Sequence, residues 1–303
     1  MKNIYVVFFL FIGIHVFGTP LFDDECDACG CSTSGGTLGF SSLLNKNFVG
    51  IRYFYQQYTS KDGLYNDSPW VKENFNTLQL WTKYSLSEKF QLSVILPFQF
   101  HNNEKSLGAQ SISGLGDASV VGFYTLFSKV SEDAVWAQNL EVGLGVKAPT
   151  GKYNSMMNGT VNPSFQVGTG SWDYLLLAEY TLVRESFGWN SSFSYNIKTE
   201  NKDQYRFGNQ FNYNSVIFYN SKIDEVVLIP QLGVAGEFFQ TNKQFGEDLK
   251  NTKGDVLFGK VGVEIGFDKF GLGINGFLPI SQNLTDGKVK SDYRLSLHLN
   301  YKL

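Results

Sequence analysis

The chain ends in YRLSLHLNYKL, Tyr293–Leu303, a stretch in which apolar and polar side chains alternate at every position. Successive side chains of an extended strand point to opposite faces, so this order places every Leu and Tyr on one face and Arg294, His298 and Lys302 on the other. Chain ends usually fray unless an interaction holds them. The unbroken alternation therefore predicts a final strand that is paired on both sides and has an apolar environment against one face.

The same period of two runs through the chain from residue 48 onward. Its clearest internal example is FQLSVILPFQF, Phe90–Phe100, in which every second residue is apolar. The pattern predicts twelve strands, at residues 48–58, 75–86, 90–101, 115–127, 135–148, 170–182, 188–199, 205–219, 225–239, 254–267, 270–281 and 291–303. An even number of strands, each long enough to cross a bilayer when tilted, is typical of a closed transmembrane barrel.

The connections between these strands alternate in length. Short connections are expected at residues 87–89, 128–134, 183–187, 220–224 and 268–269, and longer ones at 59–74, 102–114, 149–169, 200–204, 240–253 and 282–290. Short turns on one side and longer loops on the other are typical of outer-membrane barrels. We therefore predict an all-β fold, a transmembrane antiparallel up-and-down β-barrel of about twelve strands, in the outer membrane of a Gram-negative bacterium.

Charged side chains fall on the face opposite to the apolar one in the expected strands. A basic side chain facing lipid at mid-membrane costs about 2–4 kcal/mol, so the charged face is the interior. The residues expected to line this lumen are Arg52, Lys83, Glu141, Lys147, Glu179, Lys260 and Glu264. Aromatic residues such as Trp81 and Phe258 share that face. Two interpretations remain: a narrow channel for small amphipathic solutes, or an interior packed shut by aromatic rings and ion pairs.

Three segments follow one another along the chain. Residues 1–18 contain a Lys followed by an apolar run that is too short to span a membrane, which predicts a cleaved export signal. Residues 19–47 are rich in Cys and Gly and are expected in the periplasm, where their flexible part would allow them to enter the lumen as a plug. Residues 48–303 are expected to form the barrel.

The sequence CDACGC brings Cys26, Cys29 and Cys31 close together after the export signal. Thiolates suit a soft metal such as Cu(I), and no nearby His completes a standard zinc set. The alternative is one disulfide and a spare thiol, as an oxidising periplasm favours. These thiols are the candidate metal ligands, and no other cofactor is expected.

Three motifs resemble one known family. They are GLGDASVVGFYTL at residues 114–126, LGVKAPTGKYN at 144–154 and VGTGSWD at 167–173. The spacing is similar to that of the outer-membrane transporters named for meta-pathway phenol degradation, over residues 45–303 with the strong motif in 114–173. The resemblance implies a barrel that passes small aromatic or hydrophobic compounds. The Cys cluster departs from it, and from the residues alone Pro149-Thr150-Gly151 ends a strand and opens a turn.

The expected function is that of an outer-membrane channel passing small, partly hydrophobic or aromatic solutes by passive diffusion. The alternative is a non-conducting barrel that displays the Cys segment for copper handling or protein contact. Expected partners are outer-membrane lipid, the solute, and the assembly machinery, which would recognise Tyr293–Leu303. A net charge of −3 indicates no nucleic-acid partner. No enzyme is expected, because only His101 and His298 remain after processing, near opposite ends of their strands.

Overall fold

The computed structural model describes residues 42–44, 47–61, 68–105, 108–132, 135–153, 156–157 and 160–303. The expected export signal at 1–18, the three cysteines and most of the segment 19–47 lie outside the described residues.

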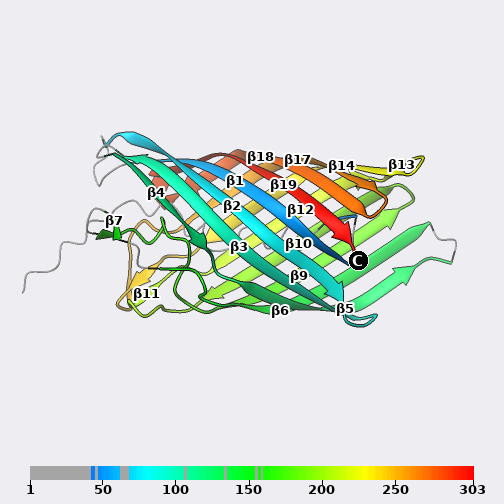
Figure 1. Ribbon diagram of the computed structural model, residues 1–303, viewed down its shortest axis with the longest axis horizontal. Helices are drawn as coiled ribbons and strands as arrows, with labels where there is room; N and C mark the ends of the chain where they lie inside the picture. The colour runs from blue at the N-terminus through cyan, green and yellow to red at the C-terminus, as the bar shows by residue number, and fades with distance from the viewer. Residues whose placement is uncertain are drawn as a thin grey trace, which may run out of the picture.

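The described chain forms one antiparallel wall that closes on itself (Figure 1). β4 and β5 both pair with β3, and β12 and β13 both pair with β14, so fourteen elements make the predicted twelve wall strands. The elements are β1 (Phe48–Lys61), β2 (Trp70–Ser85), β3 (Phe90–Lys105), β4 (Gly108–Leu115), β5 (Ser119–Val130), β6 (Trp136–Lys147), β9 (Asp173–Arg184), β10 (Phe187–Lys198), β12 (Gln210–Tyr219), β13 (Ser221–Ile223), β14 (Val226–Phe239), β17 (Gly254–Phe267), β18 (Phe270–Leu284) and β19 (Val289–Lys302).

The last strand explains the alternation at the chain end. β19 pairs with β1 from Phe48 opposite Lys302 to Ser60 opposite Val289, and with β18 on its other side. The first and last strands of the barrel therefore pair with each other, so neither presents a free edge to lipid, where an unpaired backbone group would be costly. With neighbours on both sides, the strand keeps its apolar face toward lipid up to its end.

The two ends of the barrel differ in the length of the connections between strands. At the turn end, two-residue links join β9 to β10, β13 to β14 and β17 to β18. Glu185, Asp224 and Asp268 begin these links with positive φ angles of 52°, 54° and 49°. At the loop end lie the longer connections, with the small elements β7 (Met156–Met157), β8 (Thr160–Val161), β11 (Tyr205–Arg206), β15 (Lys243–Gln244), β16 (Glu247–Asp248) and η1 (Thr285–Gly287).

Several predicted strand bounds at the loop end were wrong. The expected loop 102–114 is largely strand, since β3 runs to Lys105 and β4 begins at Gly108. The expected strand 205–219 begins at Gln210, and Tyr205–Arg206 belongs to a separate sheet with β15 and β16. Outside the bilayer both faces of a hairpin meet water, so the apolar period ends there while backbone pairing continues. The sequence pattern therefore marks the membrane boundary, and the strands extend beyond it.

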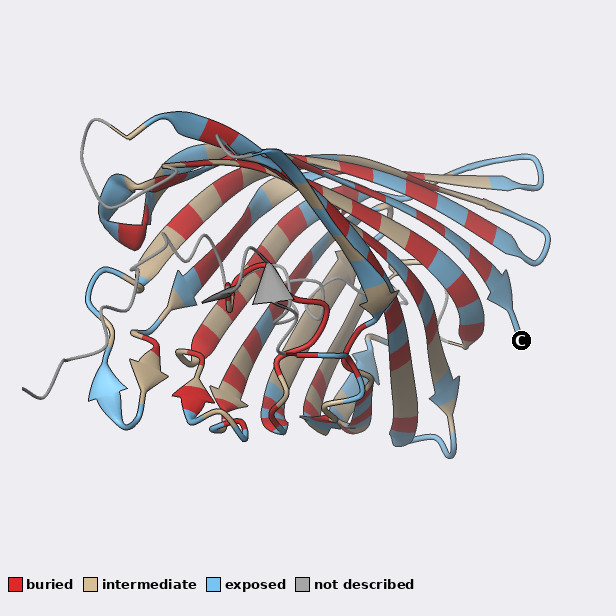
Figure 2. Ribbon diagram, turned by 60° about the vertical axis from the view of Figure 1, so that its left-hand side comes forward, coloured by how far each residue is buried: buried red, intermediate tan, exposed pale blue. Residues whose placement is uncertain are grey.

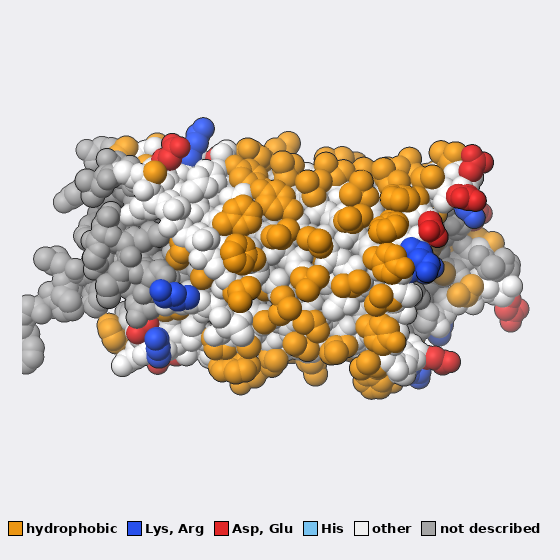
Figure 3. All heavy atoms as spheres, viewed as in Figure 1, with side chains coloured by type: hydrophobic (Ala, Val, Ile, Leu, Met, Phe, Trp, Pro, Cys, Tyr) orange, Lys and Arg blue, Asp and Glu red, His pale blue; other side chains and the backbone are white. Residues whose placement is uncertain are grey.

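Exposed and buried residues alternate along the strands (Figure 2). On the face shown in Figure 3, exposed apolar side chains form a broad band across the middle of the barrel, with charged side chains toward its two ends. At the turn end the Phe270 ring lies 5.7 Å from Phe267 and 5.4 Å from Tyr301. Toward the loop end Tyr55 and Tyr293 lie 5.6 Å apart. Aromatic rings at these two levels are typical of the two interfaces of a membrane.

No helix among the described residues is long and apolar enough to cross a membrane.

Between β18 and β19 the wall is interrupted. Phe277 is paired with Arg294, and the next pair is Leu284 with Val289. Pro279 lies within this gap and has no N–H to donate. The Gln282 side chain bridges it: its amide oxygen accepts a bond of 2.6 Å from Ser291 N, and its Nε2 donates to Ser291 O at 3.1 Å. One side-chain amide thus replaces part of the missing backbone ladder.

Candidate functional site

The interior of the barrel contains the residues that the sequence assigns to the lumen. Arg52, Glu141, Lys147, Lys260 and Glu264 are each at most 6% exposed, and Lys83 and Glu179 are partly buried. They do not form a single cluster. The structure divides them among three regions, each of which includes partners that were not among the seven.

In the first region, ionic contacts connect non-neighbouring strands. Lys83 Nζ of β2 lies 2.9 Å from Glu141 Oε2 of β6 and 3.9 Å from Glu179 Oε2 of β9. β3 and β5 separate β2 from β6 in the wall, so this contact bridges them on the inside. The ammonium group also lies 4.7 Å from the Phe123 ring centroid, and Asn190 donates to Glu179 at 2.9 Å.

The second region, which we call the loop-end cluster, consists of Asp117, Lys147, Asp173 and Lys198. Asp173 is paired in register with Lys147 on one side and with Lys198 on the other, and Nζ–Oδ2 distances are 2.8 and 2.9 Å. Lys147 also lies 3.0 Å from Asp117 Oδ2. All four side chains are at most 4% exposed. Desolvation makes such charges costly unless each has partners, and here positive and negative groups alternate.

Asp117 fixes the connection between β6 and β9. It lies where pairing passes from β4 to β5, and it accepts bonds from Gly151 N at 2.9 Å and from Thr169 N and Oγ1, both at 2.8 Å. A Cβ at Gly168 would lie 2.6 Å from backbone atoms of Gly151, so glycine is needed for this close approach. The motifs GLGD, PTG and GTG are therefore parts of one junction. The sequence did not place Asp117 among the candidate site residues.

This junction directs part of the loop into the barrel. Phe165 is 1% exposed, and its ring lies 6.0 Å from that of Phe75 and 6.2 Å from that of His101. The inward face of the wall adds further buried aromatic rings, those of Phe54, Tyr58, Phe258 and Phe277. Together these residues form what we call the aromatic cluster, in the half of the lumen toward the loops.

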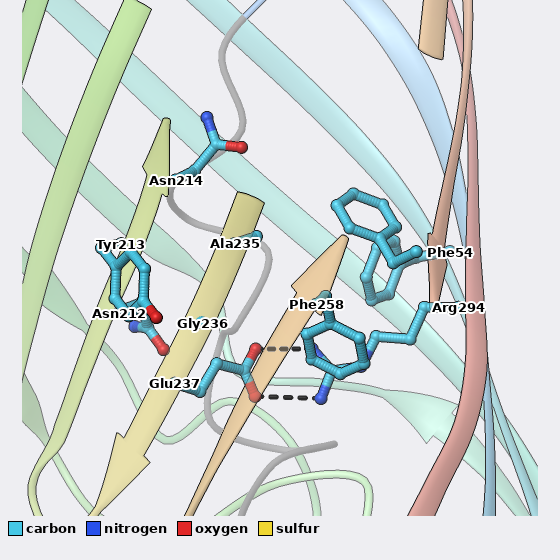
Figure 4. A pocket seen from close by; sticks show the side chains of 10 residues that line it. Phe54, Asn212, Tyr213, Asn214, Ala235, Gly236, Glu237, Phe258 and Arg294 are labelled. Atoms are coloured by element: carbon cyan, nitrogen blue, oxygen red, sulfur yellow. Dashed lines mark hydrogen bonds and ion pairs between the residues drawn. The ribbon is translucent and has the colours of Figure 1, made fainter. Parts of the chain in front are cut away.

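A buried ion pair borders the aromatic cluster (Figure 4). Arg294 Nη1 and Nη2 of β19 contact Glu237 Oε1 and Oε2 of β14 at 2.6 and 2.9 Å. Nη2 also donates to Tyr58 Oη at 2.6 Å, and the guanidinium carbon lies 4.2 Å from the Phe258 ring centroid. A small pocket opens beside these groups; it is also lined by Phe54, Asn212, Asn214 and Phe277. The sequence placed Arg294 and Glu237 on the inward face but not among the site residues.

The third region lies toward the turn end, where the chain before β1 enters the barrel. Glu264 Oε2 accepts a bond of 2.9 Å from Ser42 Oγ and one of 3.3 Å from Leu44 N, while Oε1 accepts one of 3.2 Å from Leu43 N. Glu264 is 1% exposed. Residues 42–44 are thus held against the interior wall by a single carboxylate.

Arg52 and Lys260 lie on the same half of the wall. Nε and Nη2 of Arg52 donate to Gln79 Oε1 at 2.9 and 2.6 Å, and the guanidinium carbon lies 4.6 Å from the Trp81 ring centroid. Lys260 Nζ contacts Asn214 Oδ1 at 3.4 Å. These cations are held by amides and aromatic rings.

His101 and His298, the two histidines among the described residues, lie at opposite ends of the lumen and have different surroundings. His101 Nε2 lies 2.6 Å from Gln99 Oε1, and its Nδ1 accepts a bond of 3.2 Å from Asn76 N. Both ring nitrogens therefore contact neighbouring residues of the wall. His298 Nε2 lies 3.9 Å from Glu264 Oε2. Within the part of the chain that the structure describes, no group of His, Cys, Asp and Glu could hold a metal ion. Cys26, Cys29 and Cys31 lie outside that part.

Solved structures that are similar to this chain include two outer-membrane barrels. The COG4313 outer-membrane channel from Pseudomonas putida F1 has a TM-score of 0.63 and 17% identity, over 86% of this chain and 97% of that one. The β-domain of the Bordetella autotransporter BrkA has a TM-score of 0.52 and 8% identity, over 86% of this chain and 100% of that one. At these identities the likeness concerns the fold, which is that of a Gram-negative outer-membrane barrel. The apolar band accordingly faces outer-membrane lipid.

No curated protein matches the sequence. A family model does match it, over residues 70–276. The match includes the loop-end cluster, the junction at Asp117 and Glu237 of the buried ion pair. Because it covers more than half of the sequence, the chain belongs to the family described as "Putative MetA-pathway of phenol degradation".

Proposed function

We propose that this barrel is a channel that passes small, partly hydrophobic or aromatic solutes across the outer membrane by passive diffusion, and that it is not an enzyme. The observation that carries the proposal is the amphipathic interior. Buried aromatic rings form the aromatic cluster in the loop half of the lumen, while buried amides and paired charges cover other parts of the interior wall in both halves. A solute with an apolar body and a polar end finds suitable contacts in both halves.

The comparisons support this proposal in two ways. The similar barrel from Pseudomonas putida F1 is described as an outer-membrane channel. The family description refers to phenol degradation, which uses small aromatic compounds. We propose that Arg52, Lys83, Glu141, Lys147, Glu179, Lys260 and Glu264 line the route. We also propose that the β19 sequence, Tyr293–Leu303, is recognised by the assembly machinery.

The test is conductance and solute flux of the refolded protein. Single-channel current in a planar bilayer would show an aqueous path, and uptake of toluene and catechol into protein-containing vesicles, corrected for protein-free vesicles, would show passage of apolar solutes. Flux without steady current fits a narrow lumen for uncharged solutes. Absence of both current and protein-dependent flux would overturn the channel proposal.

The hydrogen bonds between residues 42–44 and Glu264 favour a second role, that of a plug formed by the segment before the barrel. Their position supports the proposal that the segment 19–47 enters the lumen from the turn end and acts as a plug. In the non-conducting alternative, this segment presents Cys26, Cys29 and Cys31 for a soft metal or a protein partner. Replacing all three Cys by Ser separates the two roles, because flux should persist for a channel, whereas Cu(I) binding should disappear if the thiols are its ligands.

A further inference from the structure

Small residues make room for polar side chains on one side of the lumen, toward the turn end. Cβ atoms added to three inward-facing glycines of β1, β17 and β18 would overlap polar side chains of neighbouring strands. These side chains lie flat against the wall at positions that glycine leaves open. The pairs are Asn300 beside Gly50, Asn275 beside Gly262 and His298 beside Gly273.

Four side chains of this wall, which we call the polar patch, are Trp81, Asn275, His298 and Asn300. They are 5%, 7%, 6% and 0% exposed. Trp81 Nε1, Asn275 Oδ1, His298 Nε2 and both amide atoms of Asn300 have no hydrogen-bond partner. Buried polar atoms are nearly always hydrogen-bonded, and leaving them unpaired costs free energy. Their concentration on neighbouring strands points to a polar ligand.

Donor and acceptor atoms converge within the patch. The Trp81 ring lies 5.7 Å from the His298 ring, and Trp81 Nε1 and Asn300 Oδ1 both lie beside the position of a Cβ at Gly50. Trp81 can only donate a hydrogen bond, an Asn side chain can donate and accept, and a neutral imidazole can do either. A hydroxyl group, which both donates and accepts, matches this set.

The charges around the patch favour an uncharged ligand. Arg52 lies 4.6 Å from the Trp81 ring on one side, and Glu264 lies 3.9 Å from His298 Nε2 on the other. Arg52 is engaged by Gln79, and Glu264 by residues 42–44. An anion would meet Glu264 and a cation would meet Arg52, so neither gains a net attraction.

Aromatic rings lie next to the patch, toward the loop end. Phe54 follows Arg52 by two residues on β1, and Phe277 follows Asn275 by two residues on β18, so all four face inward. The Phe54 and Phe277 rings are 6.4 Å apart. A ligand with its polar end at the patch would place its apolar body against these rings.

We propose that the polar patch is a binding subsite for the hydroxyl groups of an uncharged aromatic solute, whose ring lies against Phe54 and Phe277. This inference rests on the proposed function and names the solute class that the lumen selects. Trp81 and Asn300 supply the central hydrogen bonds, and the alternation of donors and acceptors suits two neighbouring hydroxyls better than one.

The test is binding of catechol, toluene and benzoate to the refolded full-length protein in lipid nanodiscs, measured by saturation-transfer NMR against protein-free nanodiscs. Asn300→Leu and Trp81→Phe remove hydrogen-bonding groups of the patch. The matched control is Asn103→Leu, because Asn103 of β3 is also 0% exposed and both of its amide atoms also lack partners. Mobility on unheated electrophoresis gels establishes that each variant is folded.

We expect catechol to bind more tightly than toluene or benzoate. Each patch variant should weaken the affinity for catechol about tenfold, which corresponds to about 1.4 kcal/mol of binding free energy. Toluene affinity should be unchanged, and Asn103→Leu should behave as wild type. Equal effects of Asn300→Leu and Asn103→Leu, or equal affinity for catechol and toluene, would overturn the subsite. Binding is measured separately from transport. If the barrel binds catechol but shows no flux, only the channel proposal is rejected. If it shows flux but binds catechol no more tightly than toluene, only the subsite is rejected.

Discussion

Replacing Glu237 by Gln tests whether the buried ion pairs of the lumen stabilise the barrel. The substitution keeps the size of the side chain and removes its charge. The Arg294 guanidinium then keeps its contacts with Tyr58 Oη and the Phe258 ring but loses the contact with a carboxylate. The side chains of Arg294 and Glu237 are 3% and 5% exposed, so little water reaches the guanidinium to replace the lost carboxylate. Breaking a buried pair by removing one partner costs about 3–5 kcal/mol. We expect about 3 kcal/mol, because the amide oxygen of Gln still accepts one bond.

The chain offers a matched exposed pair as a control. Lys243 and Asp248 also form an ion pair, with Nζ–Oδ1 at 3.1 Å, but their side chains are 41% and 66% exposed. Exposed pairs contribute about 0–1 kcal/mol, so Asp248→Asn should change stability little. The assay is reversible urea unfolding of the refolded protein in lipid vesicles, followed by tryptophan fluorescence, with the free energies of unfolding compared under identical conditions.

A third variant separates loss of the pair from loss of charge. In Glu237→Leu with Arg294→Leu neither charge remains buried, and such replacements are often neutral or stabilising. The double variant should therefore be more stable than Glu237→Gln. If Glu237→Gln costs no more than Asp248→Asn, or if the double variant is the least stable of the three, the inference that the lumen is dry enough for charges to need partners is refuted.

Three further predictions concern the loop, the lipid face and the segment before β1. Asp117→Asn should accelerate amide hydrogen exchange at Gly151 and Thr169 at least tenfold while leaving the wall strands protected; unchanged exchange would contradict the proposed junction. Leu297→Lys, on the lipid face, should cost about 2–4 kcal/mol in urea unfolding, and Leu303→Lys at the chain end about 0–1; equal costs would contradict the placement of the bilayer. Glu264→Ala should raise single-channel conductance by releasing residues 42–44, and an unaltered conductance would argue against a plug.

The fold could be predicted because the bilayer imposes a pattern on every strand. Phe90–Phe100 and Tyr293–Leu303 alternate strictly, since one face meets lipid and the other the lumen. The same reason explains the wrong bounds near Lys105 and Gly108, where both faces meet water and pairing leaves no apolar period. The outward face of each strand followed from its apolar positions, and the charged residues fell on the opposite, inward face.

The grouping of the interior residues could not be predicted in the same way. The pattern shows that Glu237 and Arg294 face inward, but their contact joins β14 to β19 across two intervening strands. The alternation within a strand carries no information about contacts between strands that are not neighbours. The junction at Asp117 was missed because its partners are backbone and side-chain atoms of residues 34 and 52 positions later. Only the glycines of the PTG and GTG motifs indicated it, since close backbone approach requires residues without a Cβ.

The ion pairs also bear on the route of a solute. Lys83–Glu141 and Arg294–Glu237 each join strands that are not neighbours, so they act as struts across the interior. A solute that separated either pair would meet a barrier of several kcal/mol, which is incompatible with rapid passive diffusion. The wall of β1, β17, β18 and β19 toward the turn end instead has glycines beside its polar side chains. We infer that the solute moves between this wall and the struts on the other side of the lumen, from the aromatic cluster to the polar patch, and that the struts keep the barrel from collapsing onto it.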